Sequence, residues 1–336
     1  MDDTYQRLLK LIQLMSPQQL GQLEQAIWER RAAPLPDFEK AMATVTEPSP
    51  PPALPAPPTV AETIEGAFLA RLQCPHCSSI AITKWGAANG LRRYRCKACK
   101  ATFNALTGTP LAQLHNRELW SAYAQTMIDG LSLRKAAIRS GASLDQAFRW
   151  RHRFMKAPKD LKAKKLSGTV EADETYFRYS EKGNRKLSRK ARKRGGDGAK
   201  RGLSDDQVPV LIARDRNKET TDQVLPDRSE KSITAVLEPV VAADAILVSD
   251  GALAYGAFAD KAQILHISLV ASKGERCFGI YHIQNVNAYI SGLKTWMVRF
   301  KGVATKNLDT YLGWNRMNDR HGSTLSVNQL LIAAIG

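Results

Sequence analysis

Acidic residues stand at two places where the sequence pattern predicts strands. In the run Val-Glu-Ala-Asp-Glu-Thr-Tyr, alternation along a strand puts Glu171 and Asp173 on one face and Glu174 on the other. Asp250 closes a short apolar run, so its carboxylate emerges at the C-terminal end of a buried strand, where open α/β sheets place their chemistry. Carboxylates in a core strand are costly unless a cation or a donor compensates them. Taken singly, each has a simpler interpretation, a turn residue for Asp250 and a surface acid for Asp173.

Four of the five cysteines form two pairs with the spacing C-x2-C-x18-C-x2-C. They are Cys74, Cys77, Cys96 and Cys99. This spacing predicts two tight knuckles that bring four thiolates to tetrahedral geometry around Zn²⁺. Such a site has no open position, so we expect the zinc to be structural. The alternative is a pair of disulfides or unconnected thiols, which a reducing compartment disfavours.

The charge of the chain points to a polyanionic partner. Its 336 residues include 49 Lys and Arg against 32 Asp and Glu, a net charge of +17 with a pI near 9.8. An apolar share of 43% excludes a wholly disordered or fibrous chain. No run approaches the ~18 apolar residues of a membrane span, and the opening residues lack a secretion signal. We expect a soluble, intracellular protein that binds DNA and no membrane.

A helix-turn-helix is predicted over residues 131–154, with its turn at residues 140–142. Ser143 and Gln146 have the spacing of a capping box that starts the second helix. We expect Leu144, Ala147 and Phe148 to form the inner face of that helix. Such a helix suits a major groove, although a plain helical hairpin with a basic face fits the same pattern.

Three clusters of residues, most of them basic, are predicted to contact DNA. The residues are Arg92, Arg93 and Arg95 in the cysteine module, Gln146, Arg149 and Arg153 in the second helix, and Arg185, Lys186, Arg189, Lys190, Arg192, Lys193 and Arg194 in a segment over residues 182–201. In that segment Asp197 is the only acid, so it cannot be core and suits a clamp on the DNA backbone. The alternatives are a protein-binding ribbon and a solubilising or targeting loop.

The remaining patterns predict five parts and a multidomain α+β fold. These are N-terminal helices over residues 1–32, a Pro-rich linker over 33–65 with more than half of the 16 prolines, a zinc ribbon over 66–110, a helix-turn-helix over 111–160, and an α/β domain over 161–336. Within the last part we expect strands near 169–179, 208–214, 220–224, 245–248 and 263–270, and helices near 231–241, 253–261 and 283–300.

The order βββαβαβα, with one acid on the first strand and another after the fourth, describes a ribonuclease H-like core. Asn287 and Lys294 are seven residues apart on the last helix, about 700° of rotation, so they share one side.

These motifs resemble those of the insertion-sequence transposases of the DDE superfamily. The resemblance is to the ISXO2-like subgroup, which has an N-terminal zinc ribbon and Asn in place of the third acid. The matching segments are 94–110, 170–176, 248–251 and 282–294, and the resemblance runs from about residue 66 to the C-terminus. By position, the family's Asp, Asp, Asn and Lys fall on Asp173, Asp250, Asn287 and Lys294. A one-step alignment error would instead select Glu171, Glu174 or Asn285.

The resemblance implies a DNA transposase that binds the terminal repeats of an insertion sequence. It implies hydrolysis of a DNA strand and attack of the freed 3′-hydroxyl on target DNA, with two Mg²⁺ ions, or Mn²⁺ instead, held by Asp173, Asp250 and Asn287. It also implies a homodimer or higher oligomer in the DNA complex, and a bacterial, cytoplasmic, nucleoid-associated protein. The alternatives are an inactive or domesticated DNA-binding protein and a nuclease without strand transfer.

Overall fold

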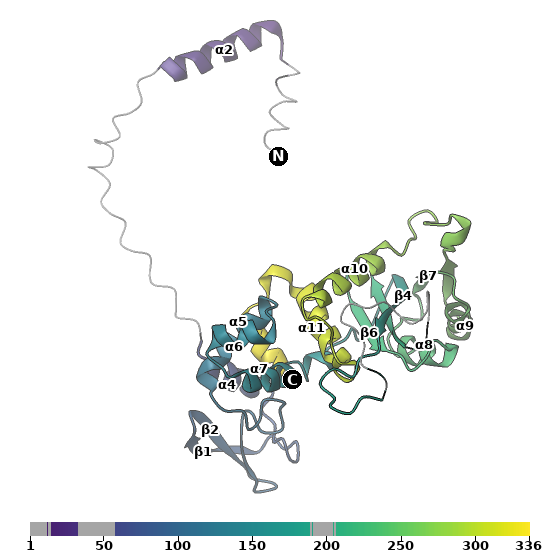
Figure 1. The fold of residues 1–336 in the computed structure, drawn as a ribbon. Helices are drawn as coiled ribbons and strands as arrows, with labels where there is room; N and C mark the ends of the chain where they lie inside the picture. The colour runs from purple at the N-terminus through teal and green to yellow at the C-terminus, as the bar shows by residue number, and fades with distance from the viewer. Residues whose placement is uncertain (1–11, 13–14, 33–57, 189, 191–203, 205) are drawn as a thin grey trace. The chain divides into compact units, whose positions relative to one another are not determined.

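The computed structural model describes residues 12, 15–32, 58–188, 190, 204 and 206–336. The chain divides into two compact units, residues 1–57 and 58–336. The described part of the first unit is essentially one helix, α2 (Pro17–Ala32), within the predicted N-terminal helices (Figure 1). Residues 1–11 and 13–14, and the linker from residue 33 to residue 57, lie outside the described residues.

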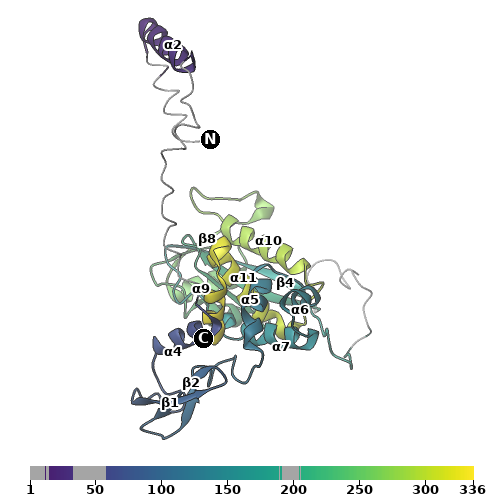
Figure 2. The same cartoon turned by 90° about the vertical axis from the view of Figure 1, so that its left-hand side faces the viewer.

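The cysteine module consists of a helix and a small antiparallel sheet. The helix is α4 (Val60–Leu69), and the strands are β1 (Ile82–Ala88), β2 (Leu91–Cys96) and β3 (Thr102–Asn104), in the order β1-β2-β3. In α4, Glu65 accepts hydrogen bonds from the main-chain N–H of Arg92 (2.9 Å) and the hydroxyl of Tyr94 (2.8 Å). These bonds hold α4 against the sheet. Both views show the helix beside β1 and β2 (Figures 1 and 2).

The predicted C-terminal end of the linker is wrong. Residues 60–65 are helical, because Thr59 and Glu62 form a capping box that starts α4. The buried Ile64 then packs into the main apolar core, so this stretch belongs to the folded unit.

Three helices follow, and a fourth returns from the C-terminus to pack on them. They are α5 (Trp120–Ile128), α6 (Leu133–Ser140), α7 (Leu144–Phe154) and α12 (Val327–Ile335). Gly141 between α6 and α7 adopts a positive φ of 74°, which glycine tolerates without strain. The predicted capping box of Ser143 and Gln146 is present at the start of α7. Because α12 packs against α4, α5 and α7, residues close to both ends of the second unit share one core.

The predicted inner face of α7 is wrong in part. Leu144 and Phe148 are about half exposed, while Ala147, Trp150 and Phe154 are buried. The larger apolar surfaces of Trp150 and Phe154 take the inner side of the helix, where they pack against Tyr123 of α5.

A five-stranded mixed sheet forms the centre of the remaining part. The strands are β4 (Thr169–Arg178), β5 (Gln207–Asp215), β6 (Thr220–Val224), β7 (Ile246–Ser249) and β8 (Leu265–Ser268), in the spatial order β6-β5-β4-β7-β8. The first three strands pair antiparallel, whereas β4 with β7 and β7 with β8 pair parallel.

Helices cover both faces of this sheet. They are α8 (Glu230–Leu237), α9 (Leu253–Ala262), α10 (Gln284–Val298) and α11 (Leu308–His321). Short 3-10 turns lie at Arg117–Leu119, Pro158–Asp160, Ala271–Lys273, Thr305–Asn307 and Gly322–Thr324. From β4 to α10 the element order is the one that the sequence pattern predicts, with shifts of a few residues at the ends.

Alternating side chains of β5 divide the core into two layers. Leu211 and Ala213 pack with α8 and α9, whereas Val210 and Ile212 face the layer of α10 and α11. Four aromatic residues, Trp296, Phe300, Tyr311 and Trp314, are buried together in the second layer. No helix of the described chain is long and apolar enough to cross a membrane.

Candidate functional site

Three carboxylates meet where the parallel pairing of β4 with β7 ends, within β4 and directly after β7. Ala172 of β4 pairs with Ser249 of β7, so the next residues, Asp173 and Asp250, emerge side by side. The carboxylate oxygens of Asp173, Asp250 and Glu174 lie within 4.8 Å of one another. They line a cleft of about 730 Å³ between β4, α8 and α9. The structure therefore brings together two acids that are 77 residues apart in the sequence.

The electrostatics of this cluster favour a bound cation. Burial, and next the charge of Asp250, raise the pKa of Asp173 to about 6. Burial is also the main reason why the pKa of Glu174 rises to about 6, with Asp250 and Asp173 adding to it and the neighbouring Tyr255 opposing it. Like charges in a half-buried cleft repel, and a divalent cation relieves that repulsion. Carboxylate oxygens are the ligands that Mg²⁺ and Mn²⁺ prefer, so this donor set fits such an ion.

By its position in the sequence, Glu174 would be a site residue only if the alignment to the family were shifted by one step. Strand alternation directs it toward the layer of α8 and α9, away from the side of Asp173 and Glu171. It still reaches the cluster because Asp250 lies just beyond the end of β7. The sequence alone does not give the parallel register that creates this meeting point.

Glu171 and Asn285, the other alignment alternatives, are bonded to each other. Asn285 donates to the fully buried Glu171 from its main-chain N–H (2.7 Å) and from Nδ2 (2.8 Å), and Val286 donates its main-chain N–H (3.0 Å). Arg216 completes an ion pair with the same carboxylate at 3.3 Å. Glu171 thus fixes the N-terminal end of α10 against β4 instead of facing the cleft.

Asn287 and Lys294 both lie on the exposed side of α10. The positive charge of Lys294 lowers the pKa of Asp173 against the larger effect of burial, so Lys294 belongs to the electrostatic surroundings of the carboxylates. Asn287 lies two turns before Lys294 on the same side of the helix. Because Glu171 anchors the N-terminal end of α10 to β4, it also sets the positions of Asn287 and Lys294 relative to that strand.

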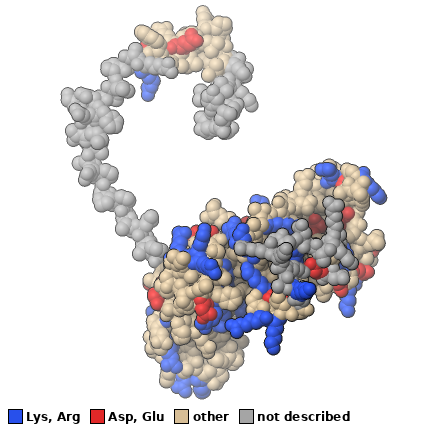
Figure 3. Space-filling model, in the orientation of Figure 1, with Lys and Arg blue, Asp and Glu red and all other residues tan. Residues whose placement is uncertain are grey.

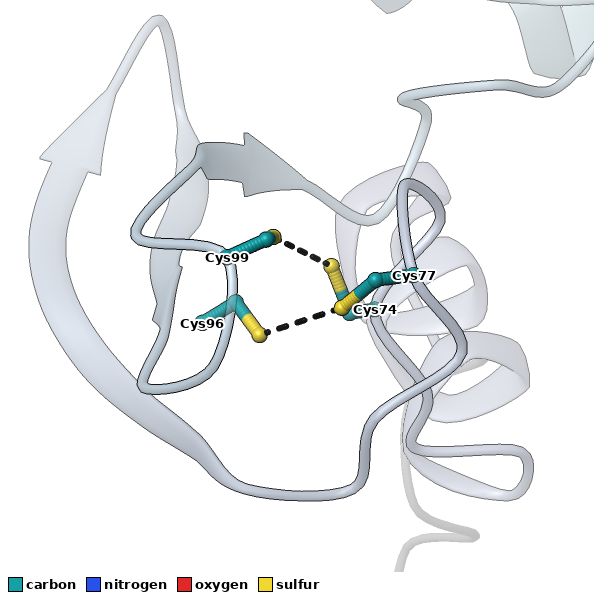
Figure 4. A group of neighbouring side chains, drawn as sticks. All are labelled: Cys74, Cys77, Cys96 and Cys99. Carbon is teal, nitrogen blue, oxygen red and sulfur yellow. Dashed lines mark hydrogen bonds between the residues drawn. The ribbon is translucent and has the colours of Figure 1, made fainter.

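The four paired cysteines form a second candidate metal centre. Their sulfur atoms lie within 4.8 Å of one another, with Cys74 Sγ 3.7 Å from Cys99 Sγ and Cys77 Sγ 3.6 Å from Cys96 Sγ (Figure 4). Four thiolates about 2.3 Å from a tetrahedral zinc are about 3.8 Å apart, so this cluster could bind zinc. Main-chain N–H groups, first that of Cys99, lower the pKa of Cys96 to about 6, whereas burial and the neighbouring thiols raise the pKa of Cys99 to about 12.

Comparison with known proteins assigns the sheet and its helices to a family. Residues 165–314 match the model of the ISXO2-like transposase domain. This domain belongs to the insertion-sequence transposases of the DDE superfamily. The chain is also 27% identical over 255 residues to an uncharacterized protein in transposable element ISH50 of Halobacterium salinarum, covering 71% of this chain and 82% of that protein. A pre-cleavage Mos1 transpososome structure is similar at 11% identity, over 63% of this chain and 73% of that chain, but its TM-score of 0.27 is too low to support an argument.

The residues predicted to contact DNA outside the transposase domain have mixed surroundings. In β2, Arg92 is exposed, Arg93 donates to Thr102 (3.1 Å), and Arg95 lies over the ring of Trp85 (4.6 Å). In α7, Arg149 is exposed and pairs with Asp145. Their roles stay predictions.

Two of the predicted contacts in α7 make structural bonds. The Gln146 side chain accepts the main-chain N–H of Ser143 in the capping box. The guanidinium of Arg153 donates to the carbonyl oxygens of Pro110 and Ala112 (2.7 Å to Ala112). Both side chains thus have protein partners, which leaves less of each for a base or a phosphate.

The basic segment interrupts the transposase domain between β4 and β5. Arg185 and Lys186 are exposed, and so is Lys190, whereas Arg189, Arg192, Lys193 and Arg194 lie outside the described residues. Basic side chains also gather on the face of the second unit seen in Figure 3, with fewer acidic ones among them. This surface suits a polyanion.

Proposed function

We propose that this chain binds the terminal repeats of an insertion sequence and catalyses metal-dependent strand cleavage and transfer of the 3′-hydroxyl end into target DNA. The observation that carries the proposal is the meeting of Asp173, within β4, and Asp250, directly after β7, at the point where the parallel pairing of these strands stops. That meeting lies inside the segment that matches a transposase family.

Asp173, Asp250 and Asn287 would hold the metal. When bound there, Mg²⁺ would supply activation of the attacking oxygen and stabilisation of the leaving oxygen in an in-line displacement. Lys294 would bind a phosphate oxygen next to the scissile bond, and its charge already acts on Asp173. Glu171 would position α10, and with it Asn287 and Lys294, through its bonds to the start of that helix.

The finer architecture is also part of the proposal. The sheet order β6-β5-β4-β7-β8, with its first three strands antiparallel, supports a ribonuclease H-like catalytic domain. The sulfur geometry of the four cysteines supports a structural zinc ribbon. The turn at Gly141 and the capped start of α7 support a helix-turn-helix that contacts DNA.

DNA binding by an assembly completes the proposal. The phosphate contacts would come from exposed cations such as Arg92, Arg149, Arg185 and Lys186, because neutralised phosphates supply most of the affinity for DNA. We also propose a homodimer or a higher oligomer on paired element ends, as the resemblance to insertion-sequence transposases implies.

A strand-transfer assay tests the function. A precleaved element end with a free 3′-hydroxyl is incubated with supercoiled plasmid and Mg²⁺. The native chain should join the end to the plasmid, and Asp173→Asn or Asp250→Asn should reduce joining by at least 10³-fold while DNA binding persists. Asp260→Asn changes an exposed acid of α9 outside the cluster and should leave joining unchanged. Binding without any strand cleavage would favour a DNA-binding protein, and cleavage without joining would favour a nuclease.

A further inference from the structure

Glu174 has no role in the proposed function, yet it is one of the three clustered carboxylates. Its oxygen lies within 4.8 Å of those of Asp173 and Asp250. It reaches them from the opposite face of β4, so the cluster is formed from both sides of the strand. The other charged side chains that line this cleft are Asp173, Asp250, Glu230 and Arg228, so Glu174 lies among more acidic than basic groups.

The number of negative charges at the proposed metal site suggests a role for the carboxylate of Glu174. In the proposed metal site, the amide of Asn287 is neutral and adds no charge to the two negative charges of Asp173 and Asp250. Neutral oxygen ligands hold a divalent cation less strongly than carboxylates do. A third carboxylate beside the two aspartates would restore the missing charge.

Tyr255 is an independent observation that points to the same site. It lies on α9, its side chain is completely buried, and the carboxylate of Glu174 is the hydrogen-bonding group that acts on its hydroxyl, although the bond between the two is not closed in this structure. Burial, then the charges of Glu174 and Asp173, raise the pKa of Tyr255 well above its ordinary value, so it remains a hydroxyl donor beside these carboxylates. Ligating carboxylates are usually held by such a donor on their outer oxygen.

We propose that Glu174 is a further metal ligand of the carboxylate site, and that Tyr255 orients it by donating its hydroxyl proton to the oxygen that does not face the metal. This inference rests on the proposed function, because it concerns the same metal site. Glu174 would supply from β4 the negative charge that Asn287 does not supply from α10.

Calorimetric titration of the zinc-loaded full chain with Mn²⁺ tests the ligand role without DNA or catalysis. Glu174→Gln keeps the shape of the side chain and should weaken Mn²⁺ binding at least tenfold. The matched control is Glu230→Gln, which changes an exposed carboxylate of the same cleft outside the cluster and should bind Mn²⁺ within twofold of the native chain. Tyr255→Phe should weaken binding two- to fivefold, since it removes only the orienting bond.

Thermal unfolding without Mn²⁺ gives a second readout. At pH 7.5 the Glu174→Gln chain should melt at a higher temperature than the native chain, because one of three mutually repelling charges is gone. Added Mn²⁺ should then stabilise it less than it stabilises the native chain. A residue with only a packing role would lower the melting temperature in both conditions.

The outcomes separate this inference from the proposed function. If Glu174→Gln binds Mn²⁺ as tightly as the native chain while Asp173→Asn does not bind it, the role of Glu174 is overturned and the two-aspartate site stands. If Mn²⁺ binding weakens as stated but no variant or native chain cleaves DNA, the metal site stands and the transposase function fails. Absence of Mn²⁺ binding by the native chain overturns both.

Discussion

At the scale of single residues, the raised pKa values in the cleft predict how stability depends on pH. The pKa of Asp173 is about 6 in the fold, above its ordinary 3.8. Between these values the folded chain binds more protons than the unfolded chain, so this residue costs stability as the pH rises. The melting temperature of metal-free Asp173→Asn relative to the native chain should therefore increase from pH 4 to pH 7, as measured by circular dichroism.

Asp227 supplies a control with the opposite sign. The hydroxyls of Ser229 and Ser232 lower its pKa to about 2, so its contribution stabilises the fold above the ordinary pKa and is lost as the pH falls toward 2. Asp227→Asn should melt below the native chain at pH 5 to 7, with the difference shrinking toward pH 2. A pH-independent difference for Asp173→Asn would contradict the interpretation of the cleft.

Residue-level prediction from the sequence succeeded where local chemistry decides the outcome. Ser143 and Gln146 cap α7 because both partners of that bond lie three residues apart. Glu174 could not be placed, because its nearness to Asp250 depends on the register of β4 and β7. The hydrogen bonds from Arg153 to the carbonyl oxygens of Pro110 and Ala112 likewise could not be predicted, because they depend on how a distant loop packs.

At the scale of elements, one buried ion pair ties α11 to the sheet. Arg316 and Asp222 are almost fully buried and bonded to each other, and the hydroxyl of Tyr289 donates to Asp222 (3.0 Å). Removing one partner leaves an uncompensated charge in the core. Asp222→Ala should lower the free energy of unfolding by about 3–5 kcal/mol, as measured by urea denaturation.

A surface ion pair provides the comparison. Glu238 pairs with Lys261 while both side chains are more than half exposed. Glu238→Ala should change the free energy of unfolding by about 0.5 kcal/mol or less. Equal losses for the two variants would show that the buried pair does not hold α11 in place.

The sequence predicted the order of elements from β4 to α10 because strand and helix periods alternate clearly there. It did not delimit α11 and α12. The packing of α12 could not be predicted from the sequence. This helix packs into the core formed by α4, α5 and α7, which lie more than 170 residues earlier in the chain. Pairing over such a separation is set by the tertiary fold rather than by any local pattern.

At the scale of the whole molecule, the cysteine module has so small an apolar core that we expect it to depend on the proposed zinc. Its small apolar cluster consists of Tyr94, Phe103 and two of the cysteines, packed against Phe68 of α4. Chelation, or Cys96→Ser, should therefore release one zinc per chain and unfold β1, β2 and β3, as seen by metal analysis and hydrogen exchange. Cys277→Ser, at an exposed cysteine outside the cluster, should change neither. Retention of the module's protection after complete zinc loss would contradict a structural metal.

The central claim is that Asp173 and Asp250 together bind a divalent cation. Anomalous diffraction from crystals of the full chain soaked in Mn²⁺ tests it most directly, and the zinc signal at the four cysteines serves as an internal reference. We expect a manganese peak in contact with carboxylate oxygens of both aspartates. A clear zinc peak with no manganese between Asp173 and Asp250 would contradict the account.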